Sequence, residues 1–245
     1  MNRMTRIVFS LLWAQWAFVS NSYASAPMVI TGDEQGGEFL NGYIDALEDK
    51  EGNLSVEDAV VSSSFESTGP DTPNFKFTDS VYWFRFGIKN KTQEPLLLLE
   101  IGYPVLDYVS LFWRDETGQF QELKSGDMLP FSERAREHRT ITFELNQEVG
   151  KTVEYYVRVK SSSSMQLPLR VYTELTFAKM SSDENMILGA YYGVILVMIL
   201  FNGLLGLSLK DDTYYHYIGY LAMWLYIQLA VNGNSHRFLF PDNPL

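Results

Sequence analysis

The feature that most constrains this chain is an uninterrupted apolar run near its carboxyl end. From Met186 to Leu209 the sequence reads MILGAYYGVILVMILFNGLLGLSL and carries no formal charge. As an α-helix this run would extend about 36 Å at ~1.5 Å per residue, more than the ~30 Å hydrocarbon core of a bilayer. A helix buried in a soluble domain rarely stays apolar on all sides for this length. The run therefore predicts a transmembrane helix over residues 186–209.

A second apolar run, residues 214–231, follows after only Lys210, Asp211 and Asp212. A connection this short predicts a tight hairpin between two membrane spans. The second run opens with Tyr214, Tyr215, His216 and Tyr217, and such amphipathic rings suit the membrane–water interface. We expect residues 232–245 to begin the next extracytoplasmic loop.

The amino end has the pattern of a secretory signal peptide. Arg3 and Arg6 precede an apolar run from Ile7 to Val19, and small residues follow at Ala24 and Ala26. We predict a signal peptide over residues 1–26, with a retained signal anchor as the alternative. Either interpretation exports residues 27–180 and leaves the Lys210–Asp212 turn on the cytoplasmic side.

Charge and composition exclude several classes of function. Acidic residues outnumber basic ones by 30 to 19, for a formal net charge of −11. We therefore expect no nucleic acid partner. The chain has no cysteine, which excludes thiolate chemistry, and its three histidines are scattered. We predict no metal site, no cofactor and no catalytic residues.

The exported region alternates apolar and polar residues with a period of two. In 82–89, Tyr82, Phe84, Phe86 and Ile88 would share one face of a strand. Residues 139–145 and 153–160 alternate in the same way, whereas 96–101 and 105–114 are more continuously apolar, as central strands are. Polar turns separate these runs. The pattern predicts a β-sandwich over residues 27–180.

Several short motifs resemble one family of bacterial receptors. They are Tyr82-Trp83-Phe84-Arg85, Glu100-Ile101-Gly102-Tyr103-Pro104, Leu106-Asp107-Tyr108-Val109, Gly126-Asp127, Pro130-Phe131, His138-Arg139, Tyr156-Val157-Arg158, Ser161–Ser164, Pro168-Leu169, Tyr191-Tyr192-Gly193, Asn202, Ser208-Leu209-Lys210-Asp211, Tyr214, Tyr217 and Asn232-Gly233. In this order they resemble the seven-transmembrane receptors with diverse intracellular signalling modules, in the form that carries the second type of extracellular domain.

The resemblance implies a jelly-roll sandwich like that of carbohydrate-binding modules, followed by seven spans and a cytoplasmic output such as a diguanylate cyclase or a histidine kinase. This chain departs from that plan because it ends at Leu245 after two predicted spans. We expect a fragment of a longer receptor or a truncated product, with any catalytic output beyond this chain. The implied location is the bacterial inner membrane, with the sensor domain in the periplasm or outside the cell.

Candidate ligand contacts follow from the chemistry of polar recognition. An aromatic ring can cover the apolar face of a sugar, while charged groups bond its hydroxyls. Arg85 and Arg158 stand beside Trp83 and Tyr156 on the polar sides of their strands. The alternative is that both arginines form structural ion pairs with Glu100, Asp107 or Glu144. His138 and Arg139 follow a charged turn at the rim, where a solvated turn is the alternative. The predicted ligand-binding set is Trp83, Arg85, Glu100, Tyr103, Asp107, His138, Arg139 and Arg158.

Three functions fit these observations. The first, which we prefer, is a sensory input module that binds a small extracytoplasmic ligand, with carbohydrate as one candidate, and signals through helices in the lipid bilayer. The second is an interaction module that regulates a partner receptor or sensor kinase or forms a homodimer. The third is an exported carbohydrate-active enzyme. The preferred function needs a ligand whose affinity differs between two receptor states.

Overall fold

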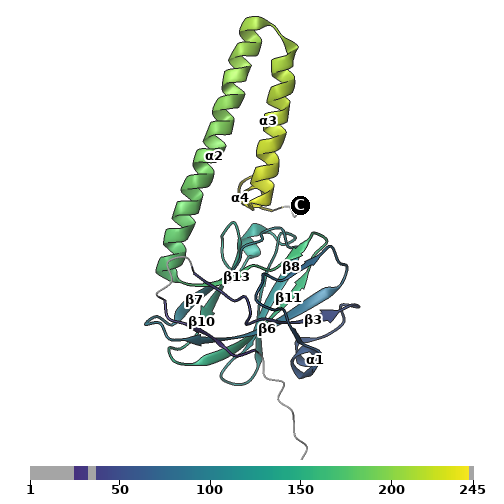
Figure 1. Cartoon of the computed structure of the whole chain (residues 1–245), viewed down its shortest axis with the longest axis vertical. Helices are drawn as coiled ribbons and strands as arrows, with labels where there is room; N and C mark the ends of the chain where they lie inside the picture. The colour runs from purple at the N-terminus through teal and green to yellow at the C-terminus, as the bar shows by residue number, and fades with distance from the viewer. Residues whose placement is uncertain (1–24, 33–36, 243–245) are drawn as a thin grey trace, which may run out of the picture.

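The structure is a computed structural model that describes residues 25–32 and 37–242. The predicted signal peptide lies outside the described residues apart from Ser25 and Ala26. A β-sandwich occupies one end of the molecule, and a long helical hairpin rises from it (Figure 1). The predicted β-sandwich fold is confirmed.

The larger sheet has seven strands and carries the centre of the domain. Its order is β4 (Glu66–Ser67), β3 (Asp45–Asp49), β6 (Val81–Asn90), β11 (Thr152–Lys160), β8 (Tyr108–Arg114) and β9 (Phe120–Ser125), with β1 (Met28–Ile30) parallel to the end of β6. The other neighbouring strands are antiparallel. On β6 and β11, Arg85 lies opposite Tyr156 and Trp83 opposite Arg158, so these four side chains share the outer face.

The smaller sheet has four strands and is the one that the helices approach. Its order is β10 (Ile141–Asn146), β7 (Leu96–Ile101), β13 (Leu169–Thr173) and β2 (Glu38–Phe39). A separate ribbon pairs β5 (Asn74–Lys76) with β12 (Met165–Gln166). The 3-10 turn η1 spans Phe131–Glu133, between β9 and β10.

The inner faces of the two sheets form the core. Phe84, Phe86 and Val157 of the larger sheet are buried with Leu99 and Phe143 of the smaller one. Burial of such side chains is worth about 1.5–3 kcal/mol each, which can stabilise a domain without disulfides.

A second apolar cluster covers the outer face of the larger sheet. Helix α1 (Val56–Val61) begins with a reciprocal capping box between Ser55 and Asp58. It packs Ala59 against Trp83 and Tyr156. Much of the face that the sequence suggested for ligand binding is therefore covered by protein.

Helix α2 spans Glu174–Leu209 and α3 spans Asp212–Val231. Lys210 ends α2 in the left-handed conformation, which gives the predicted hairpin. Tyr191 of α2 accepts hydrogen bonds from Trp224 Nε1 (2.8 Å) and Gln228 Nε2 (3.2 Å) of α3. Within the described part of the chain, α2 is the one helix long and apolar enough to cross a membrane by length and composition.

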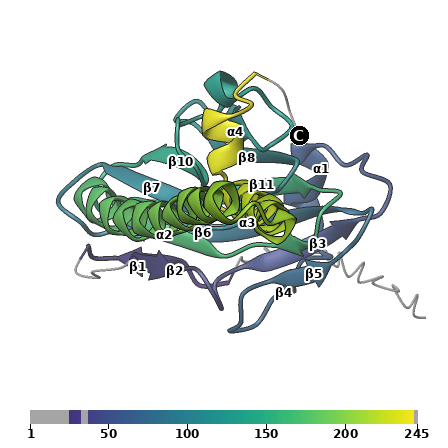
Figure 2. The same cartoon turned by 90° about the horizontal axis from the view of Figure 1, so that it is seen from above.

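Helix α2 starts earlier than the apolar run, so residues 174–185 form additional turns between the sandwich and the predicted span. This differs from the sequence interpretation, which assigned residues up to 180 to the sandwich. Short helix α4 (Asn234–Phe238) follows α3 and returns to the sandwich. Seen from above, α2 and α3 lie over the sheets with α4 beside them (Figure 2).

Candidate functional site

Strand β13 continues into α2 without a loop. The strand ends at Thr173 and the helix begins at Glu174, where the Thr173 side chain accepts a hydrogen bond from the Thr176 N–H. The acidic Glu174 in the first turn suits the positive end of the helix dipole. A shift of β13 would therefore be passed directly to the helix.

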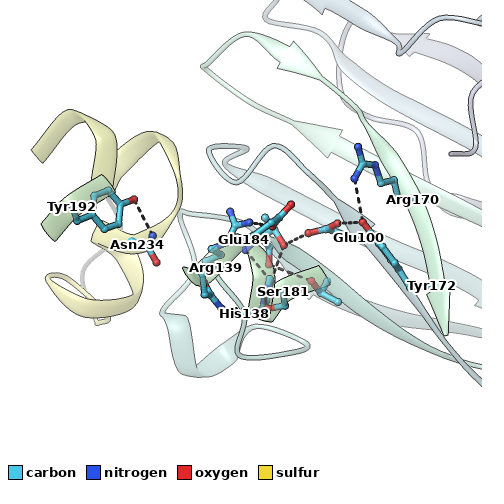
Figure 3. Close-up of polar contacts among 12 residues, drawn as sticks. Glu100, His138, Arg139, Arg170, Tyr172, Ser181, Glu184, Tyr192 and Asn234 are labelled. Atoms are coloured by element: carbon cyan, nitrogen blue, oxygen red, sulfur yellow. Dashed lines mark hydrogen bonds and ion pairs between the residues drawn. The ribbon is translucent and has the colours of Figure 1, made fainter. Parts of the chain in front are cut away.

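A chain of hydrogen bonds connects α2 to the smaller sheet (Figure 3). Ser181 Oγ lies 3.0 Å from His138 Nε2, and His138 Nδ1 lies 2.8 Å from Thr140 Oγ1. The Thr140 hydroxyl donates to Glu100 Oε1 at 2.7 Å, and the Tyr172 hydroxyl donates to Glu100 Oε2 at 2.7 Å. This network ties α2 to β7 and β13, with His138 and Thr140 in the segment before β10.

The surroundings of His138 keep its ring neutral. Its Nδ1 lies 2.8 Å from the Thr140 hydroxyl and accepts a hydrogen bond from the Thr140 N–H at 3.3 Å, and its Nε2 lies 3.0 Å from Ser181 Oγ. Burial lowers the pKa of His138 to about 4, assisted by the positive charges of Arg139, Arg237, Arg136 and Arg134. The ring is therefore neutral near neutral pH.

Ion pairing adds a second connection between the sandwich and α2. Arg139 Nη2 is paired with Glu184 Oε2 of the helix. On the smaller sheet, Arg170 of β13 lies directly opposite Glu100 of β7. Burial, followed by the charge of Glu100, raises the pKa of Tyr172 well above its usual range. The Tyr172 hydroxyl therefore stays protonated and donates.

A cavity of about 380 Å³ opens between these groups, which we call the junction cavity. This volume falls in the range of small-molecule sites. Its lining comes from β7, β10 and β13 with their adjoining loops, from α2, and from the residue that follows α3. The lining residues are Glu100, Gly102, Arg139, Thr140, Pro168, Arg170, Glu184, Ile187, Leu188 and Asn232.

The segment after α3, residues 233–241, docks on the sandwich and is called here the docking segment. Arg134 Nη2 lies 2.7 Å from His236 Nδ1, and both side chains are buried. The Phe131 N–H donates to the Pro241 carbonyl at 2.7 Å. Asn234 Nδ2 donates to the Tyr192 hydroxyl of α2 at 3.2 Å. The docking segment thus contacts both the sandwich and α2.

Burial determines the charges at this contact. Burial lowers the pKa of Arg134 to about 10, and the nearby Asp127 opposes the change. Burial and the Arg134 charge lower the pKa of His236 to about 4, so the neutral ring can accept from the guanidinium. Arg134 also donates to the carbonyls of Gly126 (3.1 Å) and His138 (3.3 Å).

The predicted residues of the larger sheet form a different, structural group. Arg85 is buried and pairs with Asp45 at 2.9 Å, not with Glu100, Asp107 or Glu144. Trp83 is buried in the cluster beneath α1. Arg158 is half-buried over the Trp83 ring and donates to the Gly52 carbonyl at 3.3 Å. They share one face, as expected, but Trp83 and Arg85 have no exposed surface for a ligand.

The last two predicted residues also have structural surroundings. Tyr103 packs against the core. Asp107 accepts hydrogen bonds from the Ser161 hydroxyl (3.1 Å) and the Ser162 N–H (2.9 Å), which fixes the turn after β11. Neither lines the junction cavity.

Three of the eight predicted residues, Glu100, His138 and Arg139, therefore meet at the junction. Sequence reasoning missed Thr140, Arg170, Tyr172 and Glu184. One signal was present, because Arg170 and Tyr172 alternate with apolar Leu169 and Val171 as in a half-buried strand. Nothing in the sequence indicated that α2 would lie over this face.

The Ser181–His138 contact has the atoms of a nucleophile and a base but lacks space for a substrate. The gap bounded by Glu100, His138, Phe177 and Ser181 is too small to hold a water molecule. The arrangement fits a structural network better than acyl transfer, which needs room at the nucleophile and an oxyanion site. Within residues 25–32 and 37–242 no group of three or more potential metal ligands is present.

Two family models match this chain, one over the sandwich and one over the helices. The family described as 7TMR-DISM extracellular 2 matches residues 41–173, and the family described as 7TM diverse intracellular signalling matches residues 184–245. No curated protein gives a significant match. Among solved structures, TmCBM61 in complex with beta-1,4-galactotriose matches with 9% identity and a TM-score of 0.32, covering 59% of this chain and 99% of that chain.

The two family matches follow one another in the order of an outward-facing sensor domain and a membrane region. They confirm the resemblance stated above and identify a membrane receptor input module. The chain belongs to the seven-transmembrane receptors with diverse intracellular signalling modules, in the form that carries the second type of extracellular domain.

Proposed function

We propose that this chain senses a small extracytoplasmic ligand in the junction cavity and passes the signal to its membrane helices. The main support for this proposal is that three parts of the molecule line the cavity. Glu100 and Arg170 belong to the sandwich, Glu184 to α2 and Asn232 to the end of α3. A ligand that contacts all three parts would bind with an affinity that depends on their relative positions. Such a difference in affinity is the requirement for transmission.

Two connections are available to transmit the change. The first is β13, which enters α2 directly and carries Arg170 and Tyr172. The second is the docking segment, which connects Arg134 of the sandwich to the end of α3 through His236. Residues 134–140 are connected to both helices, because Arg134 contacts His236 after α3 and because His138 and Arg139 contact α2. A ligand that displaced these residues would therefore act on both helices.

A carbohydrate ligand is favoured by a different observation and is the second candidate. A groove of about 590 Å³ beside β3, β4 and β5 is lined by half-buried Phe75 and Tyr82 together with Glu48, Glu66 and Asn74. The two rings lie 4.2 Å apart between centroids. Rings beside carboxylates and an amide are the groups that bind sugars, so this groove, rather than the Trp83 face, would hold one.

We further propose that the protein resides in the bacterial inner membrane, with the sandwich in the periplasm or outside the cell. The family match supports a membrane receptor whose sensor domain faces outward.

The test is thermal unfolding of the full chain in nanodiscs against sugars, amino acids and cell-wall fragments. A binder at ~100 times its dissociation constant should add ~2.7 kcal/mol to the stability of the folded state. We expect Arg139→Gln to abolish the shift and Glu48→Gln, in the groove, to preserve it. If Glu48→Gln abolished the shift and Arg139→Gln preserved it, the ligand would bind in the groove. If no compound in the library bound, this result would contradict the sensing function.

A further inference from the structure

We propose that the junction cavity recognises a zwitterion, a small ligand with an ammonium group and an anionic group, either carboxylate or phosphate. This inference rests on the proposed function, because it names the ligand class of the same cavity. Four charged side chains line the cavity, namely Glu100, Arg139, Arg170 and Glu184.

Glu100 is the candidate partner for the ammonium. Its side chain is buried, and its two oxygens accept hydrogen bonds from the Thr140 and Tyr172 hydroxyls. No cationic side chain among the described residues forms an ion pair with it within 4.0 Å. A carboxylate offers about four acceptor positions, so two remain for a ligand. A buried carboxylate without a cation favours a positively charged ligand group.

Arg170 is the candidate partner for the anion. It lies opposite Glu100 on the neighbouring strand, and the Tyr172 hydroxyl stands between them, 3.5 Å from Arg170 Nη1. Its guanidinium rests 3.9 Å from the centroid of the Phe39 ring. Within residues 25–32 and 37–242 it forms no ion pair with a carboxylate. The planar guanidinium presents several donors in a geometry that suits carboxylate or phosphate.

The other two charged side chains of the lining explain why the ligand should carry no net charge. Arg139 and Glu184 line the same cavity and neutralise each other. A ligand with a single charge would form an ion pair with either Glu100 or Arg170 and leave the other side chain without an oppositely charged ligand group.

The remaining lining sets the size and the apolar part of the ligand. Pro168, Ile187 and Leu188 form an apolar wall, and the cavity measures about 380 Å³. These features fit an α-amino acid with an aliphatic side chain. Because Ile187 and Leu188 lie at the start of the apolar run, an aminated lipid headgroup is a second source of the same chemistry.

The experiment uses the full chain in phosphatidylglycerol nanodiscs, whose lipid lacks an ammonium group. Binding is measured by calorimetry with L-leucine, with 4-methylpentanoate, which lacks the ammonium, and with 3-methylbutylamine, which lacks the carboxylate. The lipid source is tested by adding phosphatidylethanolamine to the nanodiscs and following thermal unfolding. The variants are Glu100→Gln and Arg170→Gln in the cavity. The control is Glu57→Gln, at an exposed position of α1 outside both the cavity and the groove.

Binding of leucine that is at least tenfold tighter than binding of either analogue, or about 1.4 kcal/mol, would support the inference. Both cavity variants should remove this preference, and the control should keep it. Stabilisation by phosphatidylethanolamine that both variants remove would also support it and would identify the lipid as the source.

Equal binding of leucine and 4-methylpentanoate, or binding of a neutral sugar that Arg139→Gln abolishes, would overturn the zwitterion and leave the sensing function intact. Absence of any response to leucine and to phosphatidylethanolamine would also overturn it. The sensing function would fall with it only if the wider library produced no binder either.

Discussion

Arg139, two residues before β10, is ion-paired with Glu184, on the part of α2 that precedes the apolar run. The pair joins two elements that belong to different parts of the receptor, the sensor domain and the helix that continues into the membrane. It also forms one wall of the junction cavity. A ligand in this cavity would therefore contact the connection through which it has to act.

Removing this ion pair should loosen α2 from the sandwich without unfolding either. The Arg139 side chain is 10% exposed and that of Glu184 is 38% exposed, so Arg139→Gln should cost about 1–2 kcal/mol, between the values for surface and buried pairs. Hydrogen exchange should accelerate over residues 176–186. In a double-mutant cycle Glu184→Gln should add little to Arg139→Gln, and fully additive losses would contradict a direct pair.

Arg85 should be a stability residue and not a ligand contact. Arg85→Met would leave Asp45 buried without its cation, at a cost of about 3–5 kcal/mol in the free energy of unfolding. Arg158→Met, on the same face but with one 3.3 Å hydrogen bond, should cost about 1 kcal/mol or less. Denaturant unfolding measures both. A loss of ligand affinity at unchanged stability in Arg85→Met would contradict this assignment.

Stability should fall as the pH is lowered from about 6.5 towards 4. The unfolded chain binds a proton at His138 near pH 6.5, whereas the folded protein holds the pKa near 4. Protonation in this window therefore favours unfolding, with a limiting slope of about 1.4 kcal/mol per pH unit. His236 acts in the same direction. Asp127 acts in the opposite direction, because burial raises its pKa to about 6.

The contribution of His138 is isolated by comparing slopes. His138→Gln should flatten the decline between pH 6.5 and 4, and Asp127→Asn should steepen it. Thermal unfolding at several pH values measures each slope independently of the starting stability. An unchanged slope in His138→Gln would show that the histidine titrates normally in the folded protein.

Gly233 should control the docking segment. Its φ is +74°, and a Cβ at this position would overlap the carbonyl oxygen of Arg139. Gly233→Ala should therefore displace residues 234–241 and cost more than about 1–2 kcal/mol in local stability. Faster hydrogen exchange of these residues is the readout. Gly219→Ala, where a Cβ meets no atom within 4 Å, is the control and should leave their exchange unchanged.

The sandwich could be predicted because its strands repeat a two-residue period. The run predicted for residues 96–101 coincides with β7, and the run 82–89 lies within β6. The elements between residues 31 and 73 could not be predicted from the sequence. Helix α1 and the short strands β2 and β4 have few residues each and depend on contacts with the sheets.

The site was predictable only in part, for a physical reason. Polarity marked Glu100, His138 and Arg139, but the same property marked Arg85, which pairs with Asp45 beneath protein. Whether a polar face is covered depends on tertiary packing, here of α1 on one sheet and α2 on the other. A strand pattern carries no information about which distant element lies over it.

The most direct test of the central claim is hydrogen exchange of the full chain in nanodiscs, with and without a bound ligand from the library. We predict that the ligand changes protection in residues 134–140, in the first turns of α2 from Glu174 and in the docking segment, and that Arg139→Gln abolishes these changes. Changes confined to the groove around Glu48 and Tyr82, with the junction unaffected, would contradict it.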